Sequence, residues 1–556
     1  MKIAAYNLYL STLGGGELHM GKMAELLSKD HDVDILTNKY FDLNRFSKHL
    51  NLDLSRVKLR VFPYISSEYA STITKDYDLF INATYLSYMK GYAKKNIYLT
   101  FFPTPFDVDF KFAHKLALFL FRNISRKIYN WFLIKEKKYK DALIPIEGIH
   151  DPKKFIMGRP SWTSGKAILE IQENLMKKGF VKLKINSGRK FNAPDTFLRI
   201  SLGNQLLYEY DKLSKNKSTI IEIGIPSKKN QIENENKIKN KDKIEYKNLV
   251  EKNNIIANNI ITIESNSFCP ANFYDSNDMR QLGVSIKNIS TKSILRNLIY
   301  FLIGFLPNFL LNFPDDLSFL DTYDLILAIS KYTQKWIKKK WNRESFVFYP
   351  PVDIDRFKKV EKENIILGVG RFFVGHHNKK QLELVKTFKE LCKSGLNDWH
   401  LYLVGGIEGK KEHFKYLDSV NRVSEGYPIV IKTNIPREEL NDIYSKSKIF
   451  WHASGLEEDE KKHPERFEHF GVSTVEAMAA GCVPVVINRG GQSEIVKDGT
   501  NGFLFSNLEQ LKEITLRIIN NGELQKKIRK NLLEDCKKYS SENFKRRLQK
   551  IIKNLI

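Results

Sequence analysis

Two glutamates with seven residues between them, Glu468 and Glu476, stand in the stretch whose side chains most clearly suggest chemistry. Between them, a Phe-Gly step can lead into a helix that begins with Val-Ser-Thr (residues 472–474). The free backbone N–H groups and the positive dipole end at such a helix start form a site for a phosphate. Glu476, about one turn further on, could accept hydrogen bonds from hydroxyls of the same ligand. The alternative is a strand–helix–strand unit whose glutamates face solvent.

Two basic residues, Arg371 and Lys379, could bind the same phosphate-containing ligand from the end of another strand. The string ENIILGVGRFF predicts a strand that ends at Gly370-Arg371, and Lys379 is predicted to begin the next helix. Cations at these positions could converge on a diphosphate and stabilise it as a leaving group without a metal. Lys380 is an alternative for the lysine position. A His-His pair in the same loop is interpreted as polar loop, so no metal is predicted.

Three consecutive glycines, Gly14, Gly15 and Gly16, follow a predicted first strand over residues 2–10. A predicted helix through Leu27 and a second strand come after them, which is the opening of a doubly wound α/β domain. Glycines at this position let the backbone approach a bound group closely. A tight turn without a ligand is the alternative.

The elements that must position these residues form two α/β regions separated by a region of different pattern. Strands such as DYDLFINAT and KNIYLTFFP belong to the first α/β region, and HLYLVGG, PIVIKTN and KIFWHAS belong to the second. We predict an N-terminal Rossmann-like domain (1–138, resumed at 289–349), an inserted β-rich domain (139–288), a C-terminal Rossmann-like domain (350–538) and a terminal helix (539–556).

The inserted region alternates with period two in short runs, among them KAILEIQ, VKLKINS and STIIEIGIP. This spacing favours an antiparallel, sandwich-like domain. Residues 227–258 are highly charged and low in aromatic residues, and we interpret them as a mobile loop. Asp275, Asp278 and Arg280 could fix a loop by an ion pair. The insert is interpreted as a spacer, with carbohydrate binding as the alternative.

The amino-acid composition limits the classes of partner that the protein could bind. The 556 residues carry 90 Lys and Arg against 64 Asp and Glu, a net charge of +26 that suits phosphorylated substrates, an anionic membrane surface or nucleic acid. No nucleic-acid motif accompanies this charge, so nucleic acid is not a predicted partner. Four distant cysteines without a CxxC pair suit a reducing compartment. The N-terminus is interpreted as a strand, and no run of about 18 apolar residues predicts a membrane span.

Two stretches, residues 111–137 and 293–313, are apolar, aromatic and basic at helical spacing. Such amphipathic helices are typical of proteins that lie in a membrane interface. Core helices that pack on a sheet are the alternative. Together with the net charge, these stretches favour a peripheral membrane contact.

Four features in order resemble the family 4 retaining glycosyltransferases, which have the GT-B fold. They are the glycine triplet, the Tyr349-Pro350-Pro351 link, Gly370-Arg371 with its following lysine, and residues 465–504. The likeness covers residues 1–105 loosely and 322–515 strongly, and it is greatest to the branch of lipid-linked-oligosaccharide mannosyltransferases. It implies two Rossmann-like domains that face a cleft.

The resemblance also implies a role for each matched residue. Glu468 would contact the donor hexose as the catalytic residue, and Glu476 would bind the ribose. The remaining donor-binding residues implied by it are Arg371, Lys379, Phe470, Gly471, Val472, Ser473, Thr474, Asn434, Ile435, Gly14, Gly15 and Gly16. No cofactor is implied, because the nucleotide sugar is a substrate and no metal is required.

Two departures from the family pattern stand out. Phe101 occupies the place where many relatives carry a histidine, so the role of this segment stays open. The acidic–basic run before Glu468, HASGLEEDEKKHPERFEHFG, is longer than usual. It could cover the donor, or it could be a solvated loop.

The sequence therefore predicts a retaining hexosyltransferase. It would move a hexose from a UDP or GDP sugar to a lipid-linked or polysaccharide acceptor, in the cytoplasm at the inner face of a membrane. A GT-B sugar-nucleotide epimerase or hydrolase and a non-catalytic glycan-binding protein are the alternatives.

Overall fold

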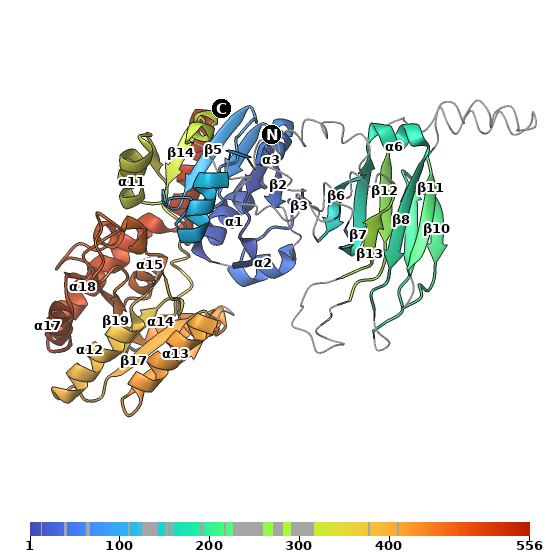
Figure 1. Ribbon diagram of the computed structural model, residues 1–556. Helices are drawn as coiled ribbons and strands as arrows, with labels where there is room; N and C mark the ends of the chain where they lie inside the picture. Colours follow the sequence, from blue (N-terminus) through green and yellow to red (C-terminus); the bar gives the residue numbers. More distant parts are fainter. Residues whose placement is uncertain are drawn as a thin grey trace, which may run out of the picture.

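The computed structural model of the protein has two parallel α/β sheets and one antiparallel sheet (Figure 1). It describes residues 1–12, 14–37, 42–62, 67–108, 112–121, 123–124, 143–150, 155, 159–189, 193–215, 218–225, 259–268, 270, 282–290, 316–375, 378–407 and 411–555. The two parallel sheets confirm the predicted GT-B class, and the antiparallel sheet is the additional β region.

The N-terminal sheet has seven parallel strands in the order β15-β14-β5-β4-β1-β2-β3. Its strand order turns back between β1 and β4, and ligands of open α/β sheets bind outside such a switch point. The bounds are β1 Lys2–Tyr6, β2 Asp32–Thr37, β3 Val57–Val61, β4 Leu79–Asn82, β5 Lys95–Thr100, β14 Leu325–Ala328 and β15 Phe346–Val347. The chain thus leaves this sheet after β5 and returns to it at β14.

The C-terminal sheet has six parallel strands in the order β18-β17-β16-β19-β20-β21, with its switch point between β16 and β19. The bounds are β16 Glu363–Val369, β17 His400–Gly405, β18 Ile429–Thr433, β19 Ser447–His452, β20 Val483–Ile487 and β21 Phe503–Phe505. The buried strands of both sheets are near-continuous apolar runs, as expected where helices cover both faces of a parallel sheet.

The antiparallel domain has eight strands, and one core cluster holds the inward side chains of all parts of the sheet. Because the hydroxyl of Tyr208 on end strand β10 donates to the carbonyl of Glu222 on end strand β11, the sheet folds over and brings its two edges together. This is the sandwich-like arrangement that period-two alternation predicts. The bounds are β6 Leu143–Ile149, β7 Ser161–Ile171, β8 Phe180–Asn186, β9 Leu198–Leu202, β10 Gln205–Tyr210, β11 Thr219–Gly224, β12 Ile260–Glu264 and β13 Ser285–Asn288.

Helices cover the parallel sheets. The α-helices are α1 Gly15–Leu27, α2 Leu43–Leu50, α3 Ser67–Thr72, α6 Glu173–Lys178, α11 Lys331–Trp341, α12 Gln381–Lys393, α13 Lys411–Ser424, α14 Arg437–Lys446, α15 Val472–Ala479, α16 Gln492–Ile495, α17 Leu508–Ile519, α18 Gly522–Asp535 and α19 Ser541–Leu555. Short 3-10 turns are η1 Leu10–Thr12, η2 Ile73–Asp76, η6 Ser318–Thr322, η7 Pro464–Arg466 and η8 Cys536–Tyr539. Residues 112–121 and 123–124 are also helical.

The last helix, α19, packs on the N-terminal domain. Phe544 of α19 stacks on Phe348 with ring centroids 4.6 Å apart, and both rings contact buried His19 of α1 at 5.2 Å. The predicted terminal helix is therefore the element that ties the end of the chain back to its first helix.

The limits of the first strand and of the helix at Lys379 differ from the predicted ones. β1 ends at Tyr6, because the Asn7 side chain accepts from the backbone N–H of Tyr9 and donates to Ala83, which turns the chain into η1. The predicted helix at Lys379 begins at Gln381, because Lys380 has a left-handed backbone (φ 58°) that a helix cannot contain.

Several predictions fall on residues outside the described ranges. They are the loop 227–258, the ion-pair residues Asp275, Asp278 and Arg280, the His-His pair 376–377, the stretch 293–313 and, within the stretch 111–137, residues 111, 122 and 125–137. The domain boundaries at 138, 288, 349 and 538 stay predictions.

Candidate active site

The two α/β domains meet at the start of two helices. A Cβ built on Gly15, at the first position of α1, would lie 3.7 Å from Cγ2 of Val472, the first residue of α15. Both helices follow the switch region of their sheet, where ligands of this architecture bind. The structure thus brings the predicted glycine triplet and the predicted phosphate-binding helix start together.

Glu468 lies just before α15 and forms the centre of a charged group. Lys379 donates to Oε2 of Glu468, and Nε2 of His452, at the end of β19, lies 3.0 Å from the same oxygen. Burial alone would raise the pKa of Glu468, but the charge of Lys379 and the hydrogen bond from His452 outweigh it and hold that pKa well below its usual value. Burial lowers the pKa of His452, so neutral His452 donates from Nε2 to an ionised Glu468.

The structure separates the two candidate lysines. Lys379 packs over Gly370, where a Cβ would lie 2.6 Å from its Cγ, and it points to Glu468. Lys380 instead pairs with Glu458 at 3.3 Å, and Glu458 also accepts from Arg466 at 2.8 Å. Because the backbone of Lys380 is left-handed, the two neighbouring side chains diverge, and the contact with Glu468 belongs to Lys379.

Glu476 is buried on α15 and accepts from two arginines, Arg356 and Arg437, through the same oxygen Oε1. Burial raises the pKa of Glu476, against the opposing charge of Arg437, and the two guanidinium groups supply the countercharge of its ionised form. A carboxylate held in this way is fixed in place, and the hydroxyl of Tyr444 also contacts it.

The start of α15 has the geometry of an anion site. Gly471 caps the helix with φ 116°, a conformation that glycine adopts without strain, and its carbonyl accepts from Thr474 and Val475. The backbone N–H groups of Val472 and Ser473 precede that first intrahelical bond and point out of the helix end. Phe470 supports the turn from below by packing against Tyr349 and Tyr539.

Arg371 follows β16, and Asn434 and Ile435 follow β18, so they lie on either side of the end of β17. Asn434, which has φ 53°, accepts from Ile407 through its side chain at 3.1 Å and donates its own N–H to Gly405. A Cβ on Gly406 would lie 3.7 Å from both Arg371 and Asn434. Asn434 therefore fixes the loop after β17 beside Arg371, while Ile435 is partly buried against the C-terminal core.

The N-terminal side of the site is made of glycines and aromatic rings. Gly14 caps α1, with its N–H donating to Glu17 at 3.0 Å. A Cβ on Gly16 would lie 3.1 Å from the ring of Phe101. Phe101 therefore covers the start of α1, in a position where a charged or hydrogen-bonding ring would have contacted the same turn.

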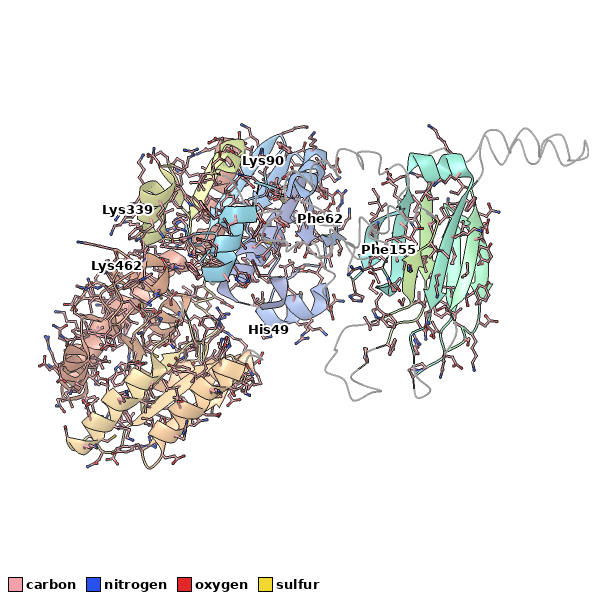
Figure 2. The ribbon with its side chains drawn as sticks, viewed as in Figure 1. His49, Phe62, Lys90, Phe155, Lys339 and Lys462 are labelled. Atoms are coloured by element: carbon pink, nitrogen blue, oxygen red, sulfur yellow. The ribbon has the colours of Figure 1, made fainter. Side chains whose placement is uncertain are left out.

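The long run before Glu468, residues 455–467, packs against α11 of the N-terminal domain. Tyr332 donates to the carbonyl of Pro464 at 2.9 Å, and Phe467 forms a buried cluster with Tyr332, Trp336 and Phe102. Next to this run, the ring of His469 stacks on Phe102 at 4.1 Å. Figure 2 labels Lys462 of this segment and Lys339 of α11 on the same side of the molecule. The run is thus a strap between the two domains.

Sequence reasoning missed four residues of the site: Arg356, Arg437, His452 and Gln492. The two arginines lie 120 and 39 residues before Glu476, so only the fold shows that they meet it. His452 ends a predicted strand, which is a position where polar side chains reach a ligand, and this signal could have found it.

Among the described residues, no group of three or more His, Cys, Asp and Glu side chains could hold a metal ion. The absence of a metal requirement stays a prediction. No helix in the described part of the chain is both long enough and apolar enough to cross a membrane.

Residues 351–534, which contain all of the C-terminal site residues described above, match the family Glycosyl transferases group 1. The C-terminal domain belongs to this glycosyltransferase family. The predicted recognition is therefore confirmed for the part of the chain that carries Arg371, Lys379, Glu468 and Glu476.

Relatives of the glycosyltransferase domain include GDP-Man:Man(3)GlcNAc(2)-PP-Dol alpha-1,2-mannosyltransferases. The Dictyostelium discoideum protein is 27% identical over 39% of this chain and 44% of its own length, and the Caenorhabditis elegans protein is 30% identical over 39% and 46%. An uncharacterised glycosyltransferase of Methanocaldococcus jannaschii is 30% identical over 42% and 60%. The chain thus matches about half the length of the curated relatives. A solved structure of Anabaena HepE with UDP has a TM-score of 0.48 at 11% identity.

Proposed function

We propose that the protein is a retaining hexosyltransferase that moves a hexose from a nucleotide diphosphate sugar to a lipid-linked or polysaccharide acceptor. One observation carries the proposal: an ionised Glu468, held by Lys379 and His452, lies just before a helix start that faces Gly15 of the other domain. This arrangement offers a carboxylate for the sugar and backbone N–H groups for the diphosphate at one place between the two domains.

The donor would lie along the carboxyl ends of the C-terminal strands. Asn434 and Ile435 would contact the base, Glu476 would contact a ribose hydroxyl, and Arg371, Lys379 and the N–H groups of Val472 and Ser473 would contact the diphosphate. As the bond to the sugar breaks, negative charge grows on the leaving phosphate, and cations fixed beforehand stabilise that charge most effectively. Lys379 would exchange part of its contact with Glu468 for this phosphate.

Two relatives are GDP-Man:Man(3)GlcNAc(2)-PP-Dol alpha-1,2-mannosyltransferases. Their activity favours GDP-mannose as the donor of this protein and a lipid-linked oligosaccharide as its acceptor. Both belong to the proposal, since the match covers only part of each protein. A UDP sugar is the alternative donor, and a panel of sugar nucleotides distinguishes them, because a ligand that binds the folded state raises its melting temperature.

A lipid-linked acceptor requires a membrane surface, and the helix over residues 112–121 offers a contact for it. Phe112 and Phe119 are 81% and 85% exposed, and Leu116, Leu120 and Phe121 are about half exposed. Residues 111–140 carry nine Lys and Arg and one Glu. Apolar side chains that enter the interface beside cations that attract anionic lipids are typical of peripheral helices. We place the protein in the cytoplasm, at the inner face of a membrane.

Two experiments test the proposal. Arg371→Ala and Glu476→Ala should abolish transfer from the sugar nucleotide that stabilises the wild type, and full activity of both variants would refute it. An epimerase or a hydrolase would release nucleotide without an acceptor, so strict dependence on added acceptor separates the transferase from them.

Membrane contact is tested by flotation with vesicles of phosphatidylcholine and phosphatidylglycerol. The double variant F112D/F119D should lose vesicle binding, while the matched variant L533D, at a 42% exposed leucine on α18, should keep it. Equal binding of all three proteins would refute this contact and leave the donor chemistry untouched.

A further inference from the structure

The amide of Gln492 lies buried beneath the start of α15. Gln492 begins α16 and is fully buried. A Cβ built on Gly471 would lie 2.9 Å from its Nε2 and 3.1 Å from its Oε1, so the amide group packs flat against the residue that caps α15. Nothing in the sequence pattern singled out this glutamine.

Thr474 fixes the orientation of that amide. The hydroxyl of Thr474, which is itself fully buried, donates to Oε1 of Gln492 at 2.9 Å. Oε1 is thus satisfied, whereas Nε2 has no hydrogen-bond partner. A buried N–H₂ group without a partner is destabilising, and the cost is removed when an acceptor binds.

The position of this unpartnered donor identifies its acceptor. Nε2 lies against the cap residue of a helix start whose first N–H groups and dipole favour an anion. Lys379, on the other side of Glu468, brings a cation to the same region. An anionic phosphate oxygen at this helix start would supply the acceptor that Nε2 lacks.

We propose that Gln492 is a donor-binding residue that hydrogen-bonds, through Nε2, the distal phosphate of the nucleoside diphosphate, and that Thr474 is the residue that positions it. The inference rests on the proposed function, because it requires that a nucleoside diphosphate binds at α15. Gln492 distinguishes a nucleoside diphosphate from a monophosphate by a hydrogen bond to the second phosphate. The acceptor of this bond is charged, and such bonds are stronger than neutral ones.

The test compares the affinities of a nucleoside diphosphate and the matching monophosphate in the full chain, measured by calorimetry. Gln492→Met keeps the shape and removes the donor, so the diphosphate should bind roughly 10- to 100-fold more weakly while the monophosphate is unaffected. Gln492→Glu places a carboxylate against the phosphate, so its affinity for the diphosphate should fall further than that of Gln492→Met. Thr474→Val should reduce this affinity less than Gln492→Met does, because it frees the amide to rotate without removing it.

A structural role alone would lower both affinities together, or only the melting temperature. Thr515→Val, which removes a fully buried hydroxyl on α17 that accepts from Trp451, is the matched control and should leave both affinities unchanged. A diphosphate-to-monophosphate affinity ratio in Gln492→Met equal to that of the wild type would overturn the inference. If the wild type binds no nucleoside diphosphate, the proposed function itself fails, and the two failures are thereby distinguished.

Discussion

The two α/β domains contribute different kinds of residue to the place where they meet. The C-terminal side carries buried or half-buried charges, each held by an opposite charge: Glu468 by Lys379, and Glu476 by Arg356 and Arg437. The N-terminal side offers glycine backbone and aromatic rings, with Gly15 and Gly16 next to Phe101. Both sides follow the switch point of a parallel sheet, so the difference comes from side chains and not from the fold.

The difference indicates a division of labour. In the proposed function, the C-terminal side binds a diphosphate and needs fixed cations and donors, and charges taken out of water are stable only when they are paired. The N-terminal side needs only to approach closely, and glycines without side chains allow this. Substitutions on the charged side should therefore affect stability and turnover most, and those on the glycine side should act through shape.

The largest effect is expected when Glu476 loses both partners. The double variant R356M/R437M leaves a buried carboxylate without a countercharge, which costs about 3–5 kcal/mol of unfolding free energy. Denaturant unfolding measures this loss, and each single variant should lose far less, because the other arginine still pairs with Glu476. Additive single losses would show that the two arginines act separately.

Lys379→Met should lower kcat/KM by about 10²- to 10³-fold, because the proposed function gives this cation the leaving phosphate to stabilise. Lys380→Met is the matched control, since the side chain of Lys380, next to Lys379 in the chain, pairs with Glu458 and not with Glu468. Steady-state kinetics with the preferred donor measure both. A greater loss in Lys380→Met would exchange the roles of the two lysines.

His19 makes the N-terminal side sensitive to acid. Burial lowers the pKa of His19 to about 3. Because this native pKa lies below the unfolded value of 6.5, the histidine favours folding fully above pH 6.5, and the native state loses stability as the pH falls toward 3. At pH 5 the loss is about 2 kcal/mol. His19→Leu should remove this part of the difference in stability between pH 7 and pH 5, and an unchanged difference would contradict the assignment.

The smallest effect is expected on the glycine side. Gly16→Ala would place a methyl group 3.1 Å from the ring of Phe101, so the ring must shift slightly, at about 1 kcal/mol. Gly16→Ala combined with Phe101→Leu should recover part of the stability. Thermal melts of the single and double variants measure this recovery. A double variant that is no more stable than the single one would show that a contact other than the Phe101 ring destabilises Gly16→Ala.

Much of the molecule could be predicted from the sequence because strand periodicity and turn glycines are local signals. The strands that end at Val369, just before Gly370, and at Thr433, and the helix start at Val472, are of this kind. The pairing of Glu476 with Arg356 and Arg437 is not, since it depends on how strands β16 to β20 are ordered in the sheet. The direction of Lys380 was missed because a left-handed backbone at a lysine leaves no mark in the sequence.

The strap, residues 455–467, is a second feature whose contacts could not be predicted from the sequence. Its composition, rich in charge, is compatible with a solvated loop, and many of its charged side chains are indeed exposed. What ties it to α11 is a few buried groups, Tyr332, Pro464 and Phe467. Contacts between residues more than a hundred positions apart cannot be inferred from the composition of either segment.

The packing of Phe544 and Phe348 around His19 has a consequence for biosynthesis. A ribosome adds roughly 5–20 residues per second, so His19 is made on the order of half a minute to two minutes before Phe544. The sheet that begins with β1 likewise waits for β14 and β15, which follow the inserted domain. The N-terminal domain is therefore the first to be translated and among the last to be completed, and its apolar surface stays open to chaperones in between.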